Sequence, residues 1–119
     1  MSIPEQIFKG AIIEESLEDG KILNNLKIIK TVVTDDEDPR DRWHIHTIEA
    51  TKGQLEEISK VIKPKKFYAH FWDDKKNIIA VFRDKIFEFK FDNEASWQPA
   101  ILYGLSVDIP REQLDFLID

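Results

Sequence analysis

The sequence contains no cysteine among its 119 residues. Disulfide bonds, thiolate metal sites, iron–sulfur clusters and a cysteine nucleophile are therefore excluded, and the composition fits a reducing compartment. Long apolar runs are missing as well, because charged residues interrupt every stretch before it reaches the ~18 residues of a membrane span. We therefore expect a cytoplasmic protein without a membrane segment.

Positive charge is also in short supply, since 17 basic residues face 23 acidic ones and the net charge is −6. A chain of this charge repels a phosphate backbone unless a local patch overrides the total. Five lysines do flank the aromatic segment 67–72: Lys63, Lys65, Lys66, Lys75 and Lys76. That segment departs from the RNA-recognition signature, because Phe67 replaces its glycine and His70 replaces an aromatic residue. We interpret the aromatics as core residues and do not expect nucleic acid as a partner.

Glycine is scarce, with four residues in the whole chain, and no phosphate-binding loop, nucleophile elbow or serine triad signature occurs. No cofactor is predicted. Apolar residues, in contrast, make up 42% of the chain and aromatic residues 11%. This is enough for one hydrophobic core, and the length fits one domain spanning residues 1–119.

Alternating and β-branched segments predict six strands. They cover about 7–13, 26–33, 43–50, 66–72, 78–82 and 86–91. A helix over 52–62 is predicted by a capping box of Thr51 and Gln54, by apolar residues at helical spacing and by Pro64 beyond its end. Two further helices are expected, one capped by Ser96 and a short one from Pro110.

Short connections make neighbouring strands antiparallel, and one apolar face on each helix implies a sheet that is covered on one side. The sequence therefore predicts an α+β class. We expect a single two-layer domain with a mostly antiparallel sheet of about six strands, covered by two or three helices.

Histidine provides the most specific candidate for chemistry. His44 and His46 are two residues apart on a predicted strand, so both side chains leave the same face, and His70 lies in another strand. If the strands are neighbours, the three imidazoles form a site for zinc or another divalent metal, with Glu49 or Asp73 as proton acceptor. The alternative is that they are polar residues on a half-exposed sheet face.

Paired acids are the second candidate. Glu14 and Glu15 follow the first strand, and adjacent residues of a regular strand point to opposite faces, which argues against a two-carboxylate mechanism. The acidic run 35–38 lacks the glycine and the distal glutamate of an EF-hand loop. We interpret this run as a solvated loop.

Several segments resemble a family of short uncharacterised prokaryotic proteins with no assigned activity. They are IIEESL (12–17), IHTIE (45–49), FYAHF (67–71), VFRDKIF (81–87), YG (103–104) and IPREQLDF (109–116). The family pattern has an acidic residue at the place of His70 and no histidine at the place of His44, so a three-histidine site would be peculiar to this chain. The resemblance retains one group of residues as a candidate polar pocket: Glu14, Glu15, His46, Arg83 and Asp115. A structural ion-pair network is the alternative interpretation of that group.

The chain shows no specific catalytic constellation, yet it is rich in aromatic residues. We therefore expect a small non-catalytic domain that binds a protein partner or itself, as in a homodimer, with Trp43, Trp72 and Trp97 as candidate contacts. The alternative is a metal-binding protein or small enzyme that uses His46 with nearby carboxylates.

Overall fold

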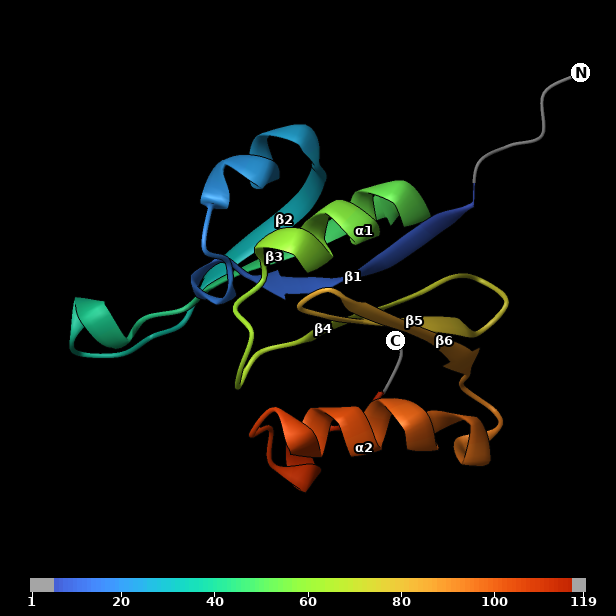
Figure 1. The fold of residues 1–119 in the computed structure, drawn as a ribbon. Helices are drawn as coiled ribbons and strands as arrows, with labels where there is room; N and C mark the ends of the chain where they lie inside the picture. The colour runs from blue at the N-terminus through green and yellow to red at the C-terminus, as the bar shows by residue number, and fades with distance from the viewer. Residues whose placement is uncertain (1–5, 117–119) are drawn as a thin grey trace, which may run out of the picture.

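The computed structural model describes residues 6–116, and these form one α+β domain around a six-stranded sheet. The strands are β1 (Ile7–Ile13), β2 (Lys27–Val33), β3 (His44–Thr51), β4 (Ala69–Trp72), β5 (Asn77–Phe82) and β6 (Lys85–Lys90). They lie in the order β2-β3-β1-β4-β5-β6, and every neighbouring pair is antiparallel. Two helices, α1 (Lys52–Val61) and α2 (Gln98–Ser106), pack on this sheet (Figure 1). The predicted fold class and all six predicted strands are confirmed.

Helix α1 begins where the sequence predicts. The Thr51 hydroxyl accepts a hydrogen bond from the Gln54 backbone N–H at 3.2 Å, and the Gln54 side-chain oxygen accepts one from the Thr51 N–H at 2.9 Å. Two backbone donors that helix geometry leaves without partners are satisfied in this way. The buried side chains of Leu55 and Ile58 then turn the helix onto the sheet.

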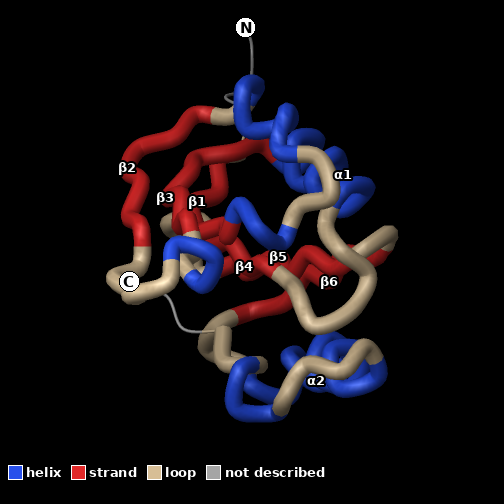
Figure 2. Tube along the Cα trace, turned by 90° about the vertical axis from the view of Figure 1, so that its left-hand side faces the viewer, coloured by secondary structure: helices blue, strands red, loops and turns tan. Residues whose placement is uncertain are grey.

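The two helices cover opposite faces of the sheet, which corrects the expectation of a single covered face. In β5, Ile79 and Val81 belong to the core beneath α1, whereas Ile78, Ala80 and Phe82 belong to the core beneath α2. Alternate residues of a strand point to opposite faces, so this strand is buried on both. Figure 2 shows α2 beside β5 and β6 at one end of the sheet, with α1 on the other side. Among the described residues, the core beneath α2 includes no side chain of β1, β2 or β3, so α2 leaves the β2 end of its face uncovered.

Short 3-10 helices replace regular structure at several connections. They are η1 (Glu14–Ser16), η2 (Gly20–Asn25), η3 (Pro39–Asp41), η4 (Glu94–Trp97) and η5 (Arg111–Gln113). The predicted helix capped by Ser96 starts instead as η4, and the Ser96 hydroxyl contacts Lys90 and Asn93 rather than the α2 N-terminus. The helix expected from Pro110 is the single turn η5. Over residues 6–116, no helix is both long and apolar enough to cross a membrane.

Candidate functional site

The three histidines do not converge. His44 and His46 leave the same face of β3, as predicted, and His46 is buried beside Ile12 and Ile48 on the α1 side. His70 lies on the opposite face of the sheet, with its ring 5.7 Å from that of Phe116 and 5.6 Å from that of Trp72. A three-histidine metal site is therefore not assembled. The spacing within β3 places His44 and His46 on one face, but it does not determine which face of the sheet the His70 side chain of β4 occupies.

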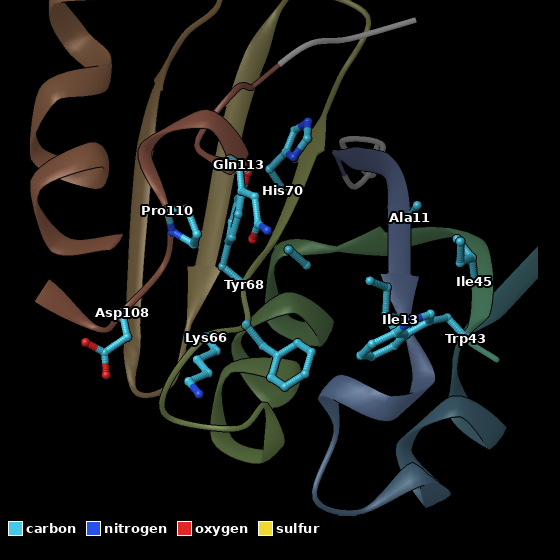
Figure 3. Close-up of a pocket in the computed structure, with 12 residues that line it drawn as sticks. Ala11, Ile13, Trp43, Ile45, Lys66, Tyr68, His70, Asp108, Pro110 and Gln113 are labelled. Atoms are coloured by element: carbon cyan, nitrogen blue, oxygen red, sulfur yellow. Dashed lines mark hydrogen bonds between the residues drawn. The ribbon is translucent and has the colours of Figure 1, made fainter. Parts of the chain in front are cut away.

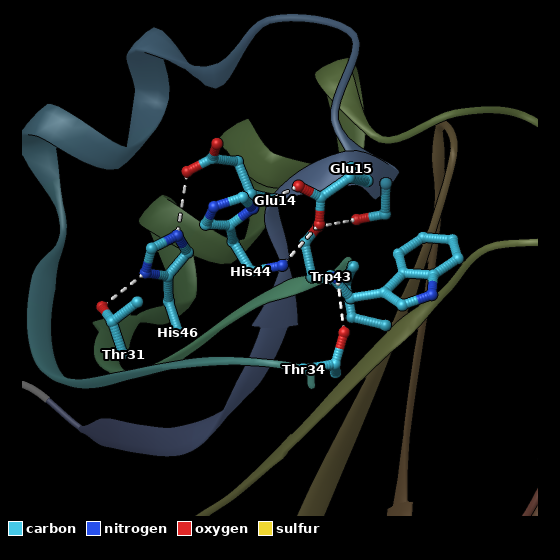
Figure 4. A network of polar contacts seen from close by, with 9 residues as sticks. Glu14, Glu15, Thr31, Thr34, Trp43, His44 and His46 are labelled. Carbon is cyan, nitrogen blue, oxygen red and sulfur yellow. Dashed lines mark hydrogen bonds and ion pairs between the residues drawn. The ribbon is translucent and has the colours of Figure 1, made fainter. Parts of the chain in front are cut away.

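A polar cluster forms instead between the histidines of β3 and the carboxylates of η1 (Figure 4). His46 Nε2 lies 3.0 Å from Glu14 Oε1, and His46 Nδ1 lies 2.8 Å from the hydroxyl of Thr31 on β2. His44 Nδ1 lies 2.7 Å from Glu15 Oε2, and the His44 backbone N–H donates to Glu15 Oε1 at 2.7 Å. Each glutamate thus contacts one histidine, and Thr31 holds the far side of the buried ring.

The 3-10 turn explains why adjacent glutamates reach the same place. The predicted separation of Glu14 and Glu15 to opposite faces assumed a regular strand, but β1 ends at Ile13 and the next three residues coil. Ser16 is buried in this turn, and its hydroxyl donates to the Ile13 carbonyl oxygen at 2.6 Å. Because residues of a tight helical turn are not separated to two faces, both carboxylates address the histidines of β3.

Hydrogen bonds in the cluster favour the ionised form of the Glu15 carboxylate. Burial alone would raise the pKa of Glu15, but hydrogen bonds from the His44 backbone and imidazole lower that pKa below its ordinary value. Within residues 6–116, neither Glu14 nor Glu15 forms an ion pair with a lysine or arginine. The two carboxylates therefore lie together, and the ion-pair partners that this part of the chain gives them are the imidazoles of His44 and His46.

The other predicted site residues lie elsewhere. Arg83 is at the β5–β6 turn, where its guanidinium contacts Glu18 and donates to the Ile62 carbonyl oxygen at 3.1 Å. Asp115 lies near Tyr68, and burial together with this negative charge raises the pKa of the Tyr68 phenol to about 12. The predicted group is thus divided, with Glu14, Glu15 and His46 together and the other two apart.

Neither proposed proton acceptor is close to the cluster. Glu49 forms an ion pair with Lys27 at 3.3 Å, and it lies on the opposite face of β3 from the histidines. Asp73 is buried at the β4–β5 turn, where its carboxylate accepts hydrogen bonds from Gln6, Lys75 and Asn77. Both acids have structural roles in these contacts.

A groove of about 750 Å³ opens between the uncovered face of β1 and β3 and the segment that follows α2 (Figure 3). Its walls are largely apolar and include Trp43 and Phe67, whose ring centres are 5.9 Å apart. Tyr68 lies deeper, and its hydroxyl donates to the Gln113 carbonyl oxygen at 2.5 Å. Volume and lining fall in the range of small-ligand pockets.

The candidate tryptophan contacts have different environments. Trp43 is 38% exposed at the groove. Trp72 and Trp97 are partly buried against the α2 core, and the Trp97 indole N–H donates to the Lys90 carbonyl oxygen at 2.8 Å. Phe71 is fully buried beneath α1, so the aromatic segment does not present a continuous surface for stacking bases. Of the three tryptophans, Trp43 is exposed and the other two are half-buried.

Strand β2 forms a second exposed surface. It is an edge strand with β3 as its single neighbour, and all seven of its residues are exposed. Its apolar side chains Ile28, Ile29, Val32 and Val33 are 40–49% exposed. Val32 pairs with Ile45, and Ile45 pairs with Ile13. This row of three, here called the apolar row, runs across the uncovered face from β2 into the groove.

Thr31 and the exposure of β2 were missed by sequence reasoning. The contact of Thr31 with His46 depends on strand register, for which the sequence carries no local signal.

Comparison of the chain with protein-family models, curated proteins and solved structures finds no match.

Proposed function

We propose that this is a non-catalytic, self-associating protein in which the β2 strand of one copy pairs with β2 of a second copy. The observation that carries the proposal is the exposure of β2, which has four isoleucine and valine residues and an outer edge that pairs with no strand of the described residues 6–116. Strand edges with free N–H and C=O groups are ready sites for pairing with another chain. Burial of these side chains by a second copy adds the apolar contact that a stable interface needs.

Charge favours an antiparallel, two-fold arrangement. Lys27 is the first residue of β2 and Lys30 is its middle residue, and the acidic run 35–38 begins two residues after the end of the strand. A two-fold axis at Thr31 places Lys27 of each copy opposite Asp35 of the other, and Lys30 then lies opposite Val32. Parallel pairing would place lysine beside lysine and acid beside acid. Opposite charges at both ends therefore select one orientation.

The edge also carries features that prevent indiscriminate pairing. A bulge at Ile29 interrupts the register between β2 and β3, and lysine side chains occupy two of the seven positions. Such bulges and lysines discourage random edge-to-edge aggregation. A second copy that supplies the complementary acids overcomes the lysine charge, so the protein discriminates in favour of itself.

The apolar row extends the interface beyond the edge. Val32, Ile45 and Ile13 lie on the face that α2 leaves uncovered, and Trp43 adjoins them at the groove. A standard interface takes about 800 Å² from each partner, roughly a tenth of the 7667 Å² surface of this chain. The row and the β2 edge are contiguous, so one partner can cover both.

The molar mass in solution tests the proposal. Size-exclusion chromatography with light scattering should give twice the 14.0 kDa of one chain. Val32→Glu should shift the protein to monomer, whereas Leu102→Glu, a matched change at an exposed position of α2, should leave the dimer intact. A wild-type chain that is monomeric at high micromolar concentration would refute the proposal.

Charge exchange tests the orientation separately. A chain that carries Lys27→Glu together with Asp35→Lys and Asp36→Lys has the charges at the two ends of β2 exchanged. In the antiparallel arrangement this variant should still form a homodimer but should not form a heterodimer with the wild type, because like charges then meet at both ends. Parallel pairing gives the reverse, so a heterodimer of the variant with the wild type would exclude the antiparallel arrangement.

A further inference from the structure

We infer that Glu14, Glu15 and His44 bind a divalent transition-metal ion, with His46 as a positioning residue behind Glu14. One ligand atom from each of the three residues lies within 4.8 Å of the other two. Zinc–ligand bonds of about 2.0–2.2 Å require ligand atoms no more than about 4.4 Å apart, so small side-chain rotations complete the site. Figure 4 shows the carboxylates of η1 directed toward the imidazoles of β3.

The donor set selects the class of metal. Two carboxylate oxygens and one imidazole nitrogen suit zinc, manganese, iron(II) or cobalt, and three protein ligands leave positions for water. The Glu14 and His44 side chains are 42% and 43% exposed, so the ion can enter from solvent.

The charge balance of the cluster also favours a cation. Glu14 and Glu15 are adjacent in the chain, and within residues 6–116 neither is paired with a lysine or arginine. In the metal-free protein, the histidine–glutamate hydrogen bonds hold the carboxylates together. A divalent ion replaces the proton in the His44–Glu15 contact and neutralises both carboxylates at once.

A second layer of contacts fixes the ligands. His46 is 9% exposed in its side chain, and both ring nitrogens are engaged, one by Thr31 and one by Glu14. The His44 backbone N–H holds one oxygen of Glu15 and leaves the other toward the His44 ring. Contacts of this kind orient ligands, and their loss lowers metal affinity by about 10–100-fold.

Isothermal titration of tag-free, EDTA-treated protein with zinc chloride and manganese chloride tests the inference. We expect one ion per chain, and cobalt(II) should give an absorption spectrum that reports the coordination number. Glu15→Gln, which preserves shape and accepts the His44 N–H, should weaken binding at least about 10-fold, and Thr31→Val should weaken it by about 10-fold through His46. His70→Asn, on the opposite face of the sheet, is the matched control and should bind like the wild type.

Two results would overturn the inference: no binding of any of the three ions, or equal affinity for the wild type and Glu15→Gln. Circular dichroism spectra of each variant verify the fold, and Glu15→Gln still provides the test if Thr31→Val fails to fold. The molar mass measured in EDTA separates this inference from self-association. A dimer that binds no metal refutes the metal site alone, and a metal-binding monomer refutes self-association alone.

Discussion

Replacement of Gly10 by alanine tests the closest approach within the sheet. Gly10 of β1 lies opposite Phe71 of β4, and an added Cβ would be 2.5 Å from the His70 carbonyl oxygen and 2.6 Å from Phe71 Cδ1. The His70 carbonyl oxygen belongs to the backbone, so it cannot move away by a side-chain rotation. Only Lys9 and Gly10 of β1 are in register with β4, so any shift acts on the short junction between the two halves of the sheet.

The size of the effect follows from two opposing terms. Overpacking of a core lowers the free energy of unfolding by about 1–3 kcal/mol, and we expect a clash with backbone atoms to cost about 3 kcal/mol. Alanine restricts the unfolded chain and offsets up to about 1 kcal/mol of this loss. The net destabilisation is therefore about 2 kcal/mol. With an unfolding entropy of about 2.1 cal/mol/K for each of the 119 residues, the melting temperature should fall by about 8 °C.

Thermal and urea unfolding followed by circular dichroism measure this change. Gly53→Ala is the matched control, because its Cβ meets only the Thr51 hydroxyl at 3.9 Å and the position is helical. Alanine should stabilise the protein there by up to about 1 kcal/mol. If Gly10→Ala is as stable as the wild type while Gly53→Ala behaves as expected, the close contact of β1 with β4 is refuted.

Three further changes test local contacts. Thr51→Ala removes the α1 capping box and should lower the free energy of unfolding by about 1 kcal/mol in urea titrations, whereas Thr51→Ser should retain most of it. For Asp73, burial alone would raise the pKa, but hydrogen bonds from Asn77, Gln6 and Lys75 hold it below its ordinary value. Its carboxylate therefore stabilises the fold above about pH 4 and loses this effect as the pH falls further, so Asp73→Asn should be less stable at neutral pH and should lose less stability on acidification. Burial, followed by the nearby Asp115, raises the pKa of Tyr68 to about 12, so the neutral phenol stabilises the fold below about pH 10 and this effect declines as the pH rises toward 12. Tyr68→Phe should therefore show a shallower alkaline loss of the urea midpoint, and an unchanged slope would contradict this account.

Local signals predicted helix α1 well because each one acts within a few residues. Thr51 and Gln54 satisfy one another's backbone donors wherever the helix packs, and Pro64 prevents continuation of the helix in any tertiary setting. The strands could also be predicted from local signals, since segments of β-branched residues alternate with turn residues along the chain. These features need no knowledge of distant contacts.

The arrangement of the candidate site depends on contacts between segments that are far apart in the sequence. The apolar residues of β1 run directly into Glu14 and Glu15 with no glycine or proline between them, so nothing in the local pattern marks the 3-10 turn. The phase of His70 relative to His46 is set by pairing of β1 with both β3 and β4. Register of this kind is decided by which face of each strand is buried, which a single segment does not reveal.

The apolar content of β2 shows why composition alone could not separate core from interface. Isoleucine and valine on both faces of a strand are typical of a strand buried on both sides, as β5 is. In β2 the same residue types remain exposed because α1 packs over β1, β3, β4 and β5 and α2 lies at the opposite end of the sheet. Isolated exposed apolar residues need no explanation, but a contiguous exposed strand with an unpaired edge does. In the dimer proposed above, a second copy would cover that strand without any change in the rest of the fold, so the features that made β2 resemble a core strand are those that a self-complementary interface requires.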